Sequence, residues 1–134
     1  MVKSTGKKKT KVAVFISGTG SNLKSLIKFS KLKKSPITIN LIVSNNKNAI
    51  GLKYGNIFKI KHKFFNFKNK ALAEKKILNI LREDKINLIC LAGFMKILSK
   101  TFIKKFRGKI LNIHPSLLPK FKGLNTHEKV INNN

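Results

Sequence analysis

Short apolar segments alternate with amphipathic segments along this chain of 134 residues. Nearly continuous runs of β-branched, aliphatic and aromatic residues predict buried strands at 11–17, 36–44, 57–65, 86–92 and 109–114. Apolar residues spaced three or four apart, and a serine at position 99 suited to a helix cap, predict helices at 23–34, 49–55, 70–84 and 99–106. This alternation predicts an α/β fold, a mostly parallel sheet with flanking helices and right-handed crossovers.

Three turn-rich segments leave the carboxyl ends of predicted strands, and they begin at Gly18, Gly93 and His114. Parallel sheets bind their ligands at the carboxyl ends of the strands. Because those ends lie at one edge of the sheet, we expect the three segments to meet there and to form the ligand-binding region.

The first of these segments, 17–22, has the sequence Ser-Gly-Thr-Gly-Ser-Asn and links a strand to a helix. Backbone N–H groups and the positive end of the helix converge at such a junction and can bind an anion. Leu23 stands where a dinucleotide-binding motif has its third glycine, and the Gly-Lys-Ser/Thr sequence of a Walker loop is absent. A single phosphate is the ligand that fits, with a plain tight turn capped by Ser21 as the structural alternative.

Two polar residues on the last predicted strand, Asn112 and His114, lie two positions apart, so their side chains face the same side. An amide can donate a hydrogen bond to a developing oxyanion, and an imidazole can move a proton near neutral pH. Together they suit acyl transfer, with a hydrogen-bonded polar pair at a strand end as the structural alternative. Cys90 lies within an apolar strand and is expected to be an inert core residue.

Three motifs in order resemble those of the phosphoribosylglycinamide formyltransferases of purine biosynthesis. They are VFISGTGSNL at 14–23, LAGFMKILS at 91–99, and LNIHPSLLPKF at 111–121 followed by GLNTH at 123–127. The resemblance implies a Rossmann-like fold of the formyltransferase type. It also implies transfer of a formyl group from 10-formyltetrahydrofolate to the amine of glycinamide ribonucleotide, with neither a metal nor a covalent intermediate.

The same resemblance assigns roles to individual residues. Gly20, Ser21 and Asn22 would bind the phosphate of the substrate, and Asn112 and His114 would be two of the three catalytic residues of the family. The residues that would contact the folate are Met95, Lys96, Ile97, Leu98 and Asn112. The family often has arginine at the position of Lys96.

The third catalytic residue of the family is an aspartate well beyond the histidine, and this sequence has no counterpart for it. The resemblance therefore predicts an amino-terminal portion of the fold, truncated at its C-terminus. The predicted regions are a basic flexible tail at 1–10, an incomplete formyltransferase domain at 11–131 and a polar tail at 132–134. Two alternatives follow: the chain is inactive alone, or it is one half of a split enzyme that a C-terminal partner chain completes.

The charge of the chain is strongly positive, with 30 Lys and Arg against 4 Asp and Glu, a formal net charge of +26. All basic residues except Arg82 and Arg107 are lysine, which indicates compositional drift toward A/T-rich codons. The alternative is a decayed or repurposed basic domain that binds nucleic acid by neutralising its phosphates. Dedicated nucleic-acid readers favour arginine for bidentate contacts, which argues against that alternative.

The remaining composition limits the class of protein. No segment has the roughly 20 apolar residues of a membrane-spanning helix, and the first residues lack the apolar region of a secretion signal. Cys and His residues do not show zinc-ligand spacing. We therefore expect a cytoplasmic protein with no membrane partner and no metal.

Overall fold

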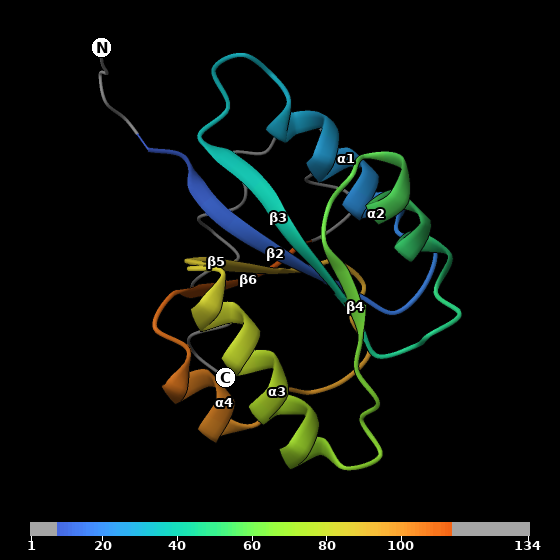
Figure 1. The fold of residues 1–134 in the computed structure, drawn as a ribbon, viewed down its shortest axis with the longest axis vertical. Coiled ribbons are helices and arrows are strands. Elements are labelled where there is room, and N and C mark those ends of the chain that lie inside the picture. Colours follow the sequence, from blue (N-terminus) through green and yellow to red (C-terminus); the bar gives the residue numbers. More distant parts are fainter. Residues whose placement is uncertain (1–7, 114–134) are drawn as a thin grey trace.

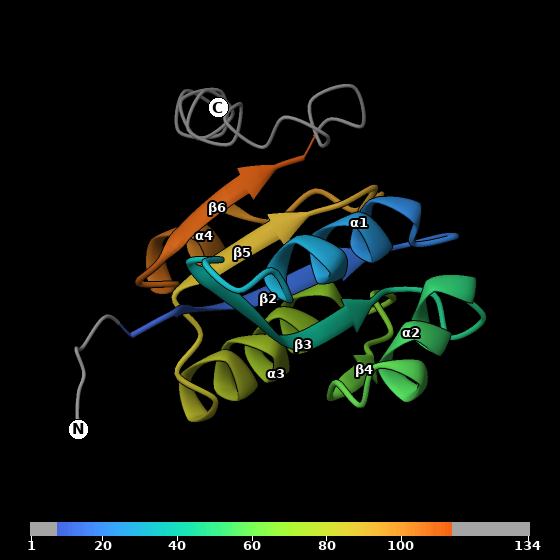
Figure 2. The ribbon, with the colours of Figure 1, turned by 90° about the horizontal axis from the view of Figure 1, so that it is seen from above.

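The computed structural model describes residues 8–113, and these residues form one parallel sheet flanked by helices. The strands are β2 (Thr10–Ile16), β3 (Ile37–Ser44), β4 (His62–Phe64), β5 (Leu88–Leu91) and β6 (Lys109–Asn112). Their order is β4-β3-β2-β5-β6, and every neighbouring pair is parallel (Figure 2). The predicted α/β fold with a parallel sheet is confirmed.

Helices cover both faces of this sheet. They are α1 (Ser21–Ser30), the 3₁₀ turn η1 (Ile50–Leu52), α2 (Lys53–Ile57), α3 (Lys70–Glu83) and α4 (Lys100–Lys105). Figure 1 shows α1 and α2 on one side of the sheet and α3 and α4 on the other. In the part of the chain that the structure describes, no helix is long and apolar enough to cross a membrane.

The central strand β2 is the middle of the hydrophobic core. Its residues 12–16 have no exposed surface. The even-numbered residues of this segment pack in a cluster with buried residues of α1, whereas the odd-numbered residues pack in a cluster with α3 and α4. A strand covered on both faces must be apolar at every position, which is why the sequence shows a continuous run there.

The segment expected as a strand at 57–65 differs most from the prediction. Helix α2 extends through Ile57, and a turn follows in which Lys59 has φ 56° and the Ile60 N–H donates to the carbonyl of Gly55 at 2.8 Å. Only His62–Phe64 then pair with β3, at the edge of the sheet. The apolar run is thus divided between a helix end, a left-handed turn and an edge strand.

The boundaries of the other elements shift by smaller amounts. Helix α1 begins at Ser21 and ends at Ser30, after which turns occupy the last residues of the expected helix. The expected cap of α4 is confirmed, because the Ser99 hydroxyl accepts a hydrogen bond from the Phe102 N–H at 3.0 Å. Thr10, expected in the basic tail, is the first residue of β2.

The tight junction between β5 and β6 gives a prediction about stability. A methyl group at Gly108 would overlap the carbonyl oxygen of Asn87, which accepts a hydrogen bond from the Lys109 N–H at 3.0 Å. We expect Gly108→Ala to lower the free energy of unfolding by about 2 to 3 kcal/mol, as overpacking of a fixed backbone does. Urea denaturation would measure the change. Gly18→Ala is the control, because among the described residues, its chain neighbours aside, no atom lies within 4 Å of the added methyl group; equal destabilisation of the two variants would contradict this expectation.

Candidate active site

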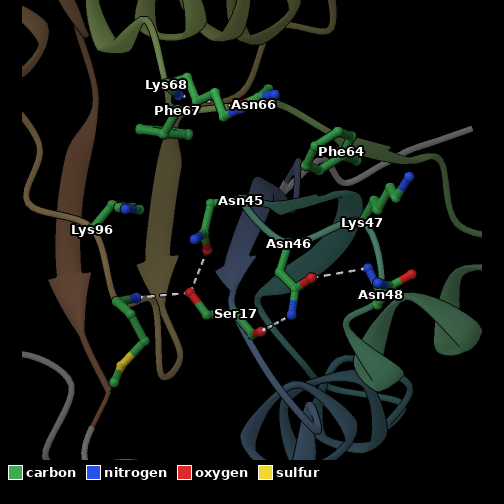
Figure 3. A pocket seen from close by; sticks show the side chains of 11 residues that line it. Ser17, Asn45, Asn46, Lys47, Asn48, Phe64, Asn66, Phe67, Lys68 and Lys96 are labelled. Carbon is green, nitrogen blue, oxygen red and sulfur yellow. Dashed lines mark hydrogen bonds between the residues drawn. The ribbon is translucent and has the colours of Figure 1, made fainter.

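Two cavities lie at the carboxyl edge of the sheet, and they share the residues Ser17 and Met95. The smaller, of about 300 Å³, is lined by residues 17–22 together with Ala92, Gly93 and Met95. The larger, of about 750 Å³, is lined by the loops after β3, β4 and β5 and is drawn in Figure 3. The segments that begin at Gly18 and Gly93 therefore meet as expected; the segment that begins at His114 lies outside the described residues.

The glycine-rich loop before α1 is fixed by a close approach of two backbones. Gly20 is buried and has φ 78°, and a Cβ at this position would lie 2.6 Å from the Cα of Gly51. The Gly51 N–H donates to the carbonyl of Gly18 at 3.0 Å, which ties the loop to η1. Both the left-handed conformation and the lack of space require glycine at position 20.

The structural alternative, a tight turn capped by Ser21, is wrong in its cap. The cap position is Gly20, no side chain caps the helix, and Ser21 is the first helical residue. The first turn of α1 also contains no acidic residue, and it opens into the smaller cavity. A helix start with unpaired N–H groups and no competing carboxylate is suited to bind a phosphate.

The side chain of Ser17 links three loops. Its hydroxyl donates to Oδ1 of Asn45 and accepts a hydrogen bond from the Met95 N–H at 2.8 Å. Its carbonyl accepts a hydrogen bond from the side-chain amide of Asn46 at 3.3 Å (Figure 3). The glycine-rich loop, the loop after β3 and the loop after β5 are therefore held together at one residue.

The loop after β5, residues 93–99, presents its middle to solvent. Met95 is 78% exposed and Ile97 is 83% exposed, and Lys96 between them is exposed as well. Phe94 turns inward, and the centroid of its ring lies 5.3 Å from that of Phe15 in an edge-on arrangement. Leu98 is also buried in the core, which leaves its backbone rather than its side chain for contact with a ligand.

The larger cavity combines positive charge with aromatic and amide groups. Its lining includes the lysines Lys47, Lys68 and Lys96, the rings of Phe64 and Phe67, and four asparagines. This lining suits an anionic ligand that contains flat rings. No cluster of His, Cys, Asp and Glu that could bind a metal is present within residues 8–113.

Of the two proposed catalytic positions, Asn112 lies within the described residues. Asn112 is exposed at the end of β6, in register with Leu91 of β5, and the Ile113 N–H donates to the Leu91 carbonyl at 2.9 Å. Asn112 lines neither cavity, and neither do Ile97 and Leu98. His114 lies outside the described residues, so the pairing of Asn112 with His114 stays a prediction.

Several residues of this region were not singled out from the sequence. The Asn45–Asn48 segment closes β3 at the carboxyl edge, so its position in a parallel sheet could have marked it as part of a site. Glu74 is buried although it is acidic, and it lies beside the apolar stripe of α3. In the sequence, the position of Glu74 close to the apolar residues Ala73 and Ile77 was the signal that it could be buried. Its hydrogen-bond partner, Ser99, lies far away along the chain.

Comparison with known proteins adds to this geometry. Residues 10–133 match the family described as formyl transferase. The chain belongs to this family. Among formyl transferase relatives, it is 43% identical over 124 residues to the phosphoribosylglycinamide formyltransferase of Haemophilus influenzae, covering 90% of this chain and 58% of that enzyme. It is 45% identical over 128 residues to the human trifunctional purine biosynthetic protein adenosine-3, covering 93% of this chain and 13% of that protein.

Solved structures of formyl transferases share the fold. The crystal structure of phosphoribosylglycinamide formyltransferase from Brucella melitensis superposes with a TM-score of 0.76 at 40% identity, covering 94% of this chain and 67% of that one. The enzyme from Anaplasma phagocytophilum superposes with a TM-score of 0.73 at 42% identity, covering 94% and 59%. The chain therefore spans little more than half of the Haemophilus enzyme and a small part of the human protein.

The contact between Gly20 and Gly51 gives a prediction about phosphate binding at the start of α1 in this formyl transferase chain. A methyl group at Gly51 would lie 2.6 Å from Cδ1 of Ile16 and 2.9 Å from the Cα of Gly20, so the glycine-rich loop must shift. We expect Gly51→Ala to weaken binding of inorganic phosphate by about tenfold, a change of roughly 1.4 kcal/mol. Isothermal calorimetry would measure it. Ile50→Ala, at an exposed neighbour, is the control and should bind phosphate normally; unchanged binding by Gly51→Ala would show that the contact does not shape the site.

The single cysteine of this formyl transferase chain gives a prediction about pH. Burial raises the pKa of the Cys90 thiol from its ordinary value of 9.0 to about 12. Because the reactive form is the thiolate, native protein at about pH 8.5 should resist iodoacetamide, while the unfolded chain reacts. Above pH 9 the unfolded chain ionises before the native one, so this thiol lowers stability as the pH rises further toward 12. Mass spectrometry of labelled samples with and without urea tests this, and fast labelling of folded protein would contradict it.

Proposed function

We propose that this chain provides the phosphate-binding and folate-binding parts of a phosphoribosylglycinamide formyltransferase. The reaction is the transfer of the formyl group of 10-formyltetrahydrofolate to the amine of glycinamide ribonucleotide. The observation that supports it best is the 2.8 Å hydrogen bond between the Met95 N–H and the Ser17 hydroxyl. This bond joins the loop assigned to the ribonucleotide to the loop assigned to the folate.

The smaller cavity is the proposed site of the ribonucleotide phosphate. Gly20, Ser21 and Asn22 line it at the uncapped start of α1. A dianionic phosphate there would accept hydrogen bonds from the first N–H groups of the helix and would benefit from its dipole. Gly20 lets the backbone at this helix start lie close to η1.

The larger cavity, beside Met95 and Lys96, is the proposed site of the folate. A folate has flat rings and carboxylates, and the lining supplies phenylalanine rings, amides and lysines for both. The exposed apolar side chains of Met95 and Ile97 would lose their contact with water when a ring system packs on them. Ile97 and Leu98 stay assigned to the folate as part of the same loop.

The proposed chemistry is a direct transfer. The amine nitrogen of the ribonucleotide forms a bond to the formyl carbon, the carbonyl oxygen becomes an oxyanion, and the bond to the folate nitrogen then breaks. Asn112 would donate a hydrogen bond to the oxyanion, and His114 would move the proton from the attacking amine toward the leaving nitrogen. No metal takes part in this proposal.

The alternative of a basic domain that binds nucleic acid is not favoured, because the relatives are formyltransferases of purine biosynthesis. A complementing chain that supplies an aspartate stays a prediction, as does a cytoplasmic location. An aspartate beside His114 would orient the imidazole and stabilise its charged form, so activity of the chain alone should be below that of a complete enzyme.

Formyl transfer by the chain, with glycinamide ribonucleotide and 10-formyltetrahydrofolate as substrates, tests the proposal. We expect Asn112→Ala and His114→Ala each to lower the rate about 100-fold or more, since each removes a group that acts on the transition state. Asn87→Ala is the matched control, because this exposed asparagine lies at the opposite edge of the sheet.

The second test of the proposal is calorimetry, which measures the binding of each substrate to the chain. If the folded chain binds neither substrate, the proposal is wrong. If both substrates bind and the two variants turn over at the unchanged rate, the proposed binding sites are supported and the assignment of the catalytic residues is wrong.

A further inference from the structure

We infer that Ser17 and Glu74 are positioning residues, which hold the 93–99 loop at its two ends and thereby set the geometry of the exposed segment 95–97. The inference deepens the proposed function and rests on it, because the segment is the one assigned to the folate. Neither residue is among those assigned to the substrates or to catalysis above.

Ser17 holds the amino-terminal side of the loop. Its hydroxyl accepts a hydrogen bond from the Met95 N–H at 2.8 Å and donates to Oδ1 of Asn45. A hydroxyl has one hydrogen to donate. Because Ser17 donates this hydrogen to Asn45, a lone pair of its oxygen is left to accept from the Met95 N–H. The loop after β3 therefore orients the group that fixes Met95.

Glu74 holds the carboxyl-terminal side of the loop. It lies on α3, is only 6% exposed, and uses both carboxylate oxygens on one residue. Oε2 accepts from the Ser99 N–H at 2.8 Å, and Oε1 accepts from the Ser99 hydroxyl at 2.6 Å. That hydroxyl also accepts from the Phe102 N–H at 3.0 Å, so Glu74 fixes the point where the loop ends and α4 begins.

The carboxylate at position 74 accepts two hydrogen bonds from Ser99, one from its N–H and one from its hydroxyl. An ionised acceptor forms shorter and stronger hydrogen bonds than a neutral one. In Glu74→Gln, one oxygen is replaced by an NH₂ group, which would face either the Ser99 N–H or its hydroxyl. Because the hydroxyl can accept as well as donate, the NH₂ group can face it, but two hydrogen bonds to a charged acceptor are replaced by weaker neutral ones, while the size of the side chain is retained.

Between these anchors the loop alternates inward and outward. Phe94, just before the first anchored residue, and Leu98, just before the second, both pack against the core, and the exposed segment 95–97 is held between them. Two exposed apolar residues are thus fixed in place before any ligand arrives. A preformed surface of this kind lowers the entropy cost of binding, so loosening either anchor should weaken the affinity for a folate.

The two anchors come from different parts of the fold, so their effects on ligand binding can be measured separately. Ser17 belongs to the glycine-rich loop as well, whereas Glu74 contacts the 93–99 loop from α3. Ordering of the phosphate site can therefore be transmitted to the folate site through Ser17. We expect phosphate to tighten folate binding in the unchanged protein and in Glu74→Gln, but not in Ser17→Ala.

The first measurement is amide hydrogen exchange by NMR on the full chain without ligands. Ser17→Ala should speed exchange of the Met95 amide, and Glu74→Gln should speed exchange of the Ser99 amide. The controls are Ser30→Ala, where the hydroxyl donates to the Ile27 carbonyl within α1, and Glu83→Gln, which is exposed on α3. Unchanged exchange at both amides would overturn the inference.

The second measurement is the affinity for 10-formyltetrahydrofolate, with and without saturating inorganic phosphate. Each positioning variant should raise the folate Kd by about 3- to 10-fold, the range expected for a lost or weakened hydrogen bond, and the controls should not. Ser17→Thr, which keeps the hydroxyl, and Glu74→Asp, which keeps the charge, separate loss of the hydrogen bond from misfolding. Ser17→Thr should restore most of the affinity.

The outcomes distinguish the two proposals. If the unchanged protein binds folate and both positioning variants bind it within twofold, the inference is wrong and the proposed function stands. If the unchanged protein is folded and binds no folate, the proposed function fails and the inference fails with it. Phosphate coupling that persists in Ser17→Ala would overturn the role of Ser17 as the link between the two sites.

Discussion

The pairing of β2 with a parallel strand on each side is the constraint on which the rest of this structure depends. Ile16 is in register with Ser44 of β3, and Phe15 is in register with Leu91 of β5. The three strands therefore end at the same level, and the loops that follow them start side by side. Ser17, the first residue after β2, reaches both neighbouring loops because it lies between them.

The fold supplies rigidity at this edge by two different means. On the side of α1 the means is steric, because two glycine backbones are in contact and leave no room for a side chain. On the side of β5 the means is polar, because the loop donates hydrogen bonds to Ser17 and Glu74, which hold it although its middle is exposed. Steric contact fixes the backbone at the start of α1, and polar anchors fix a loop that carries exposed apolar side chains.

Features set by neighbours in the sequence were predictable, and features set by distant partners were not. The continuous apolar run of β2, the glycine loop after it and the cap at Ser99 follow from local pattern and were found. The end of α2 and the short β4 were misplaced, since an apolar run does not show where a left-handed turn divides it. The hydrogen bonds of Ser17 and Glu74 join residues far apart along the chain, so no local pattern reveals them. Asn112 lies at the end of β6 as predicted, and its pairing with His114 stays a prediction.

The scarcity of acidic residues has a consequence for the surroundings of this protein. Of the acidic residues that the structure describes, Glu74 is buried against Ser99, and Asp84 pairs with Lys61 at 3.0 Å. The many lysines on the surface therefore find few internal counterions, and dissolved anions must form the compensating ionic atmosphere. Metabolites that bear phosphates or carboxylates belong to that atmosphere. They are enriched around the whole molecule before any of them reaches the carboxyl edge of the sheet, and this enrichment weakens as salt displaces them.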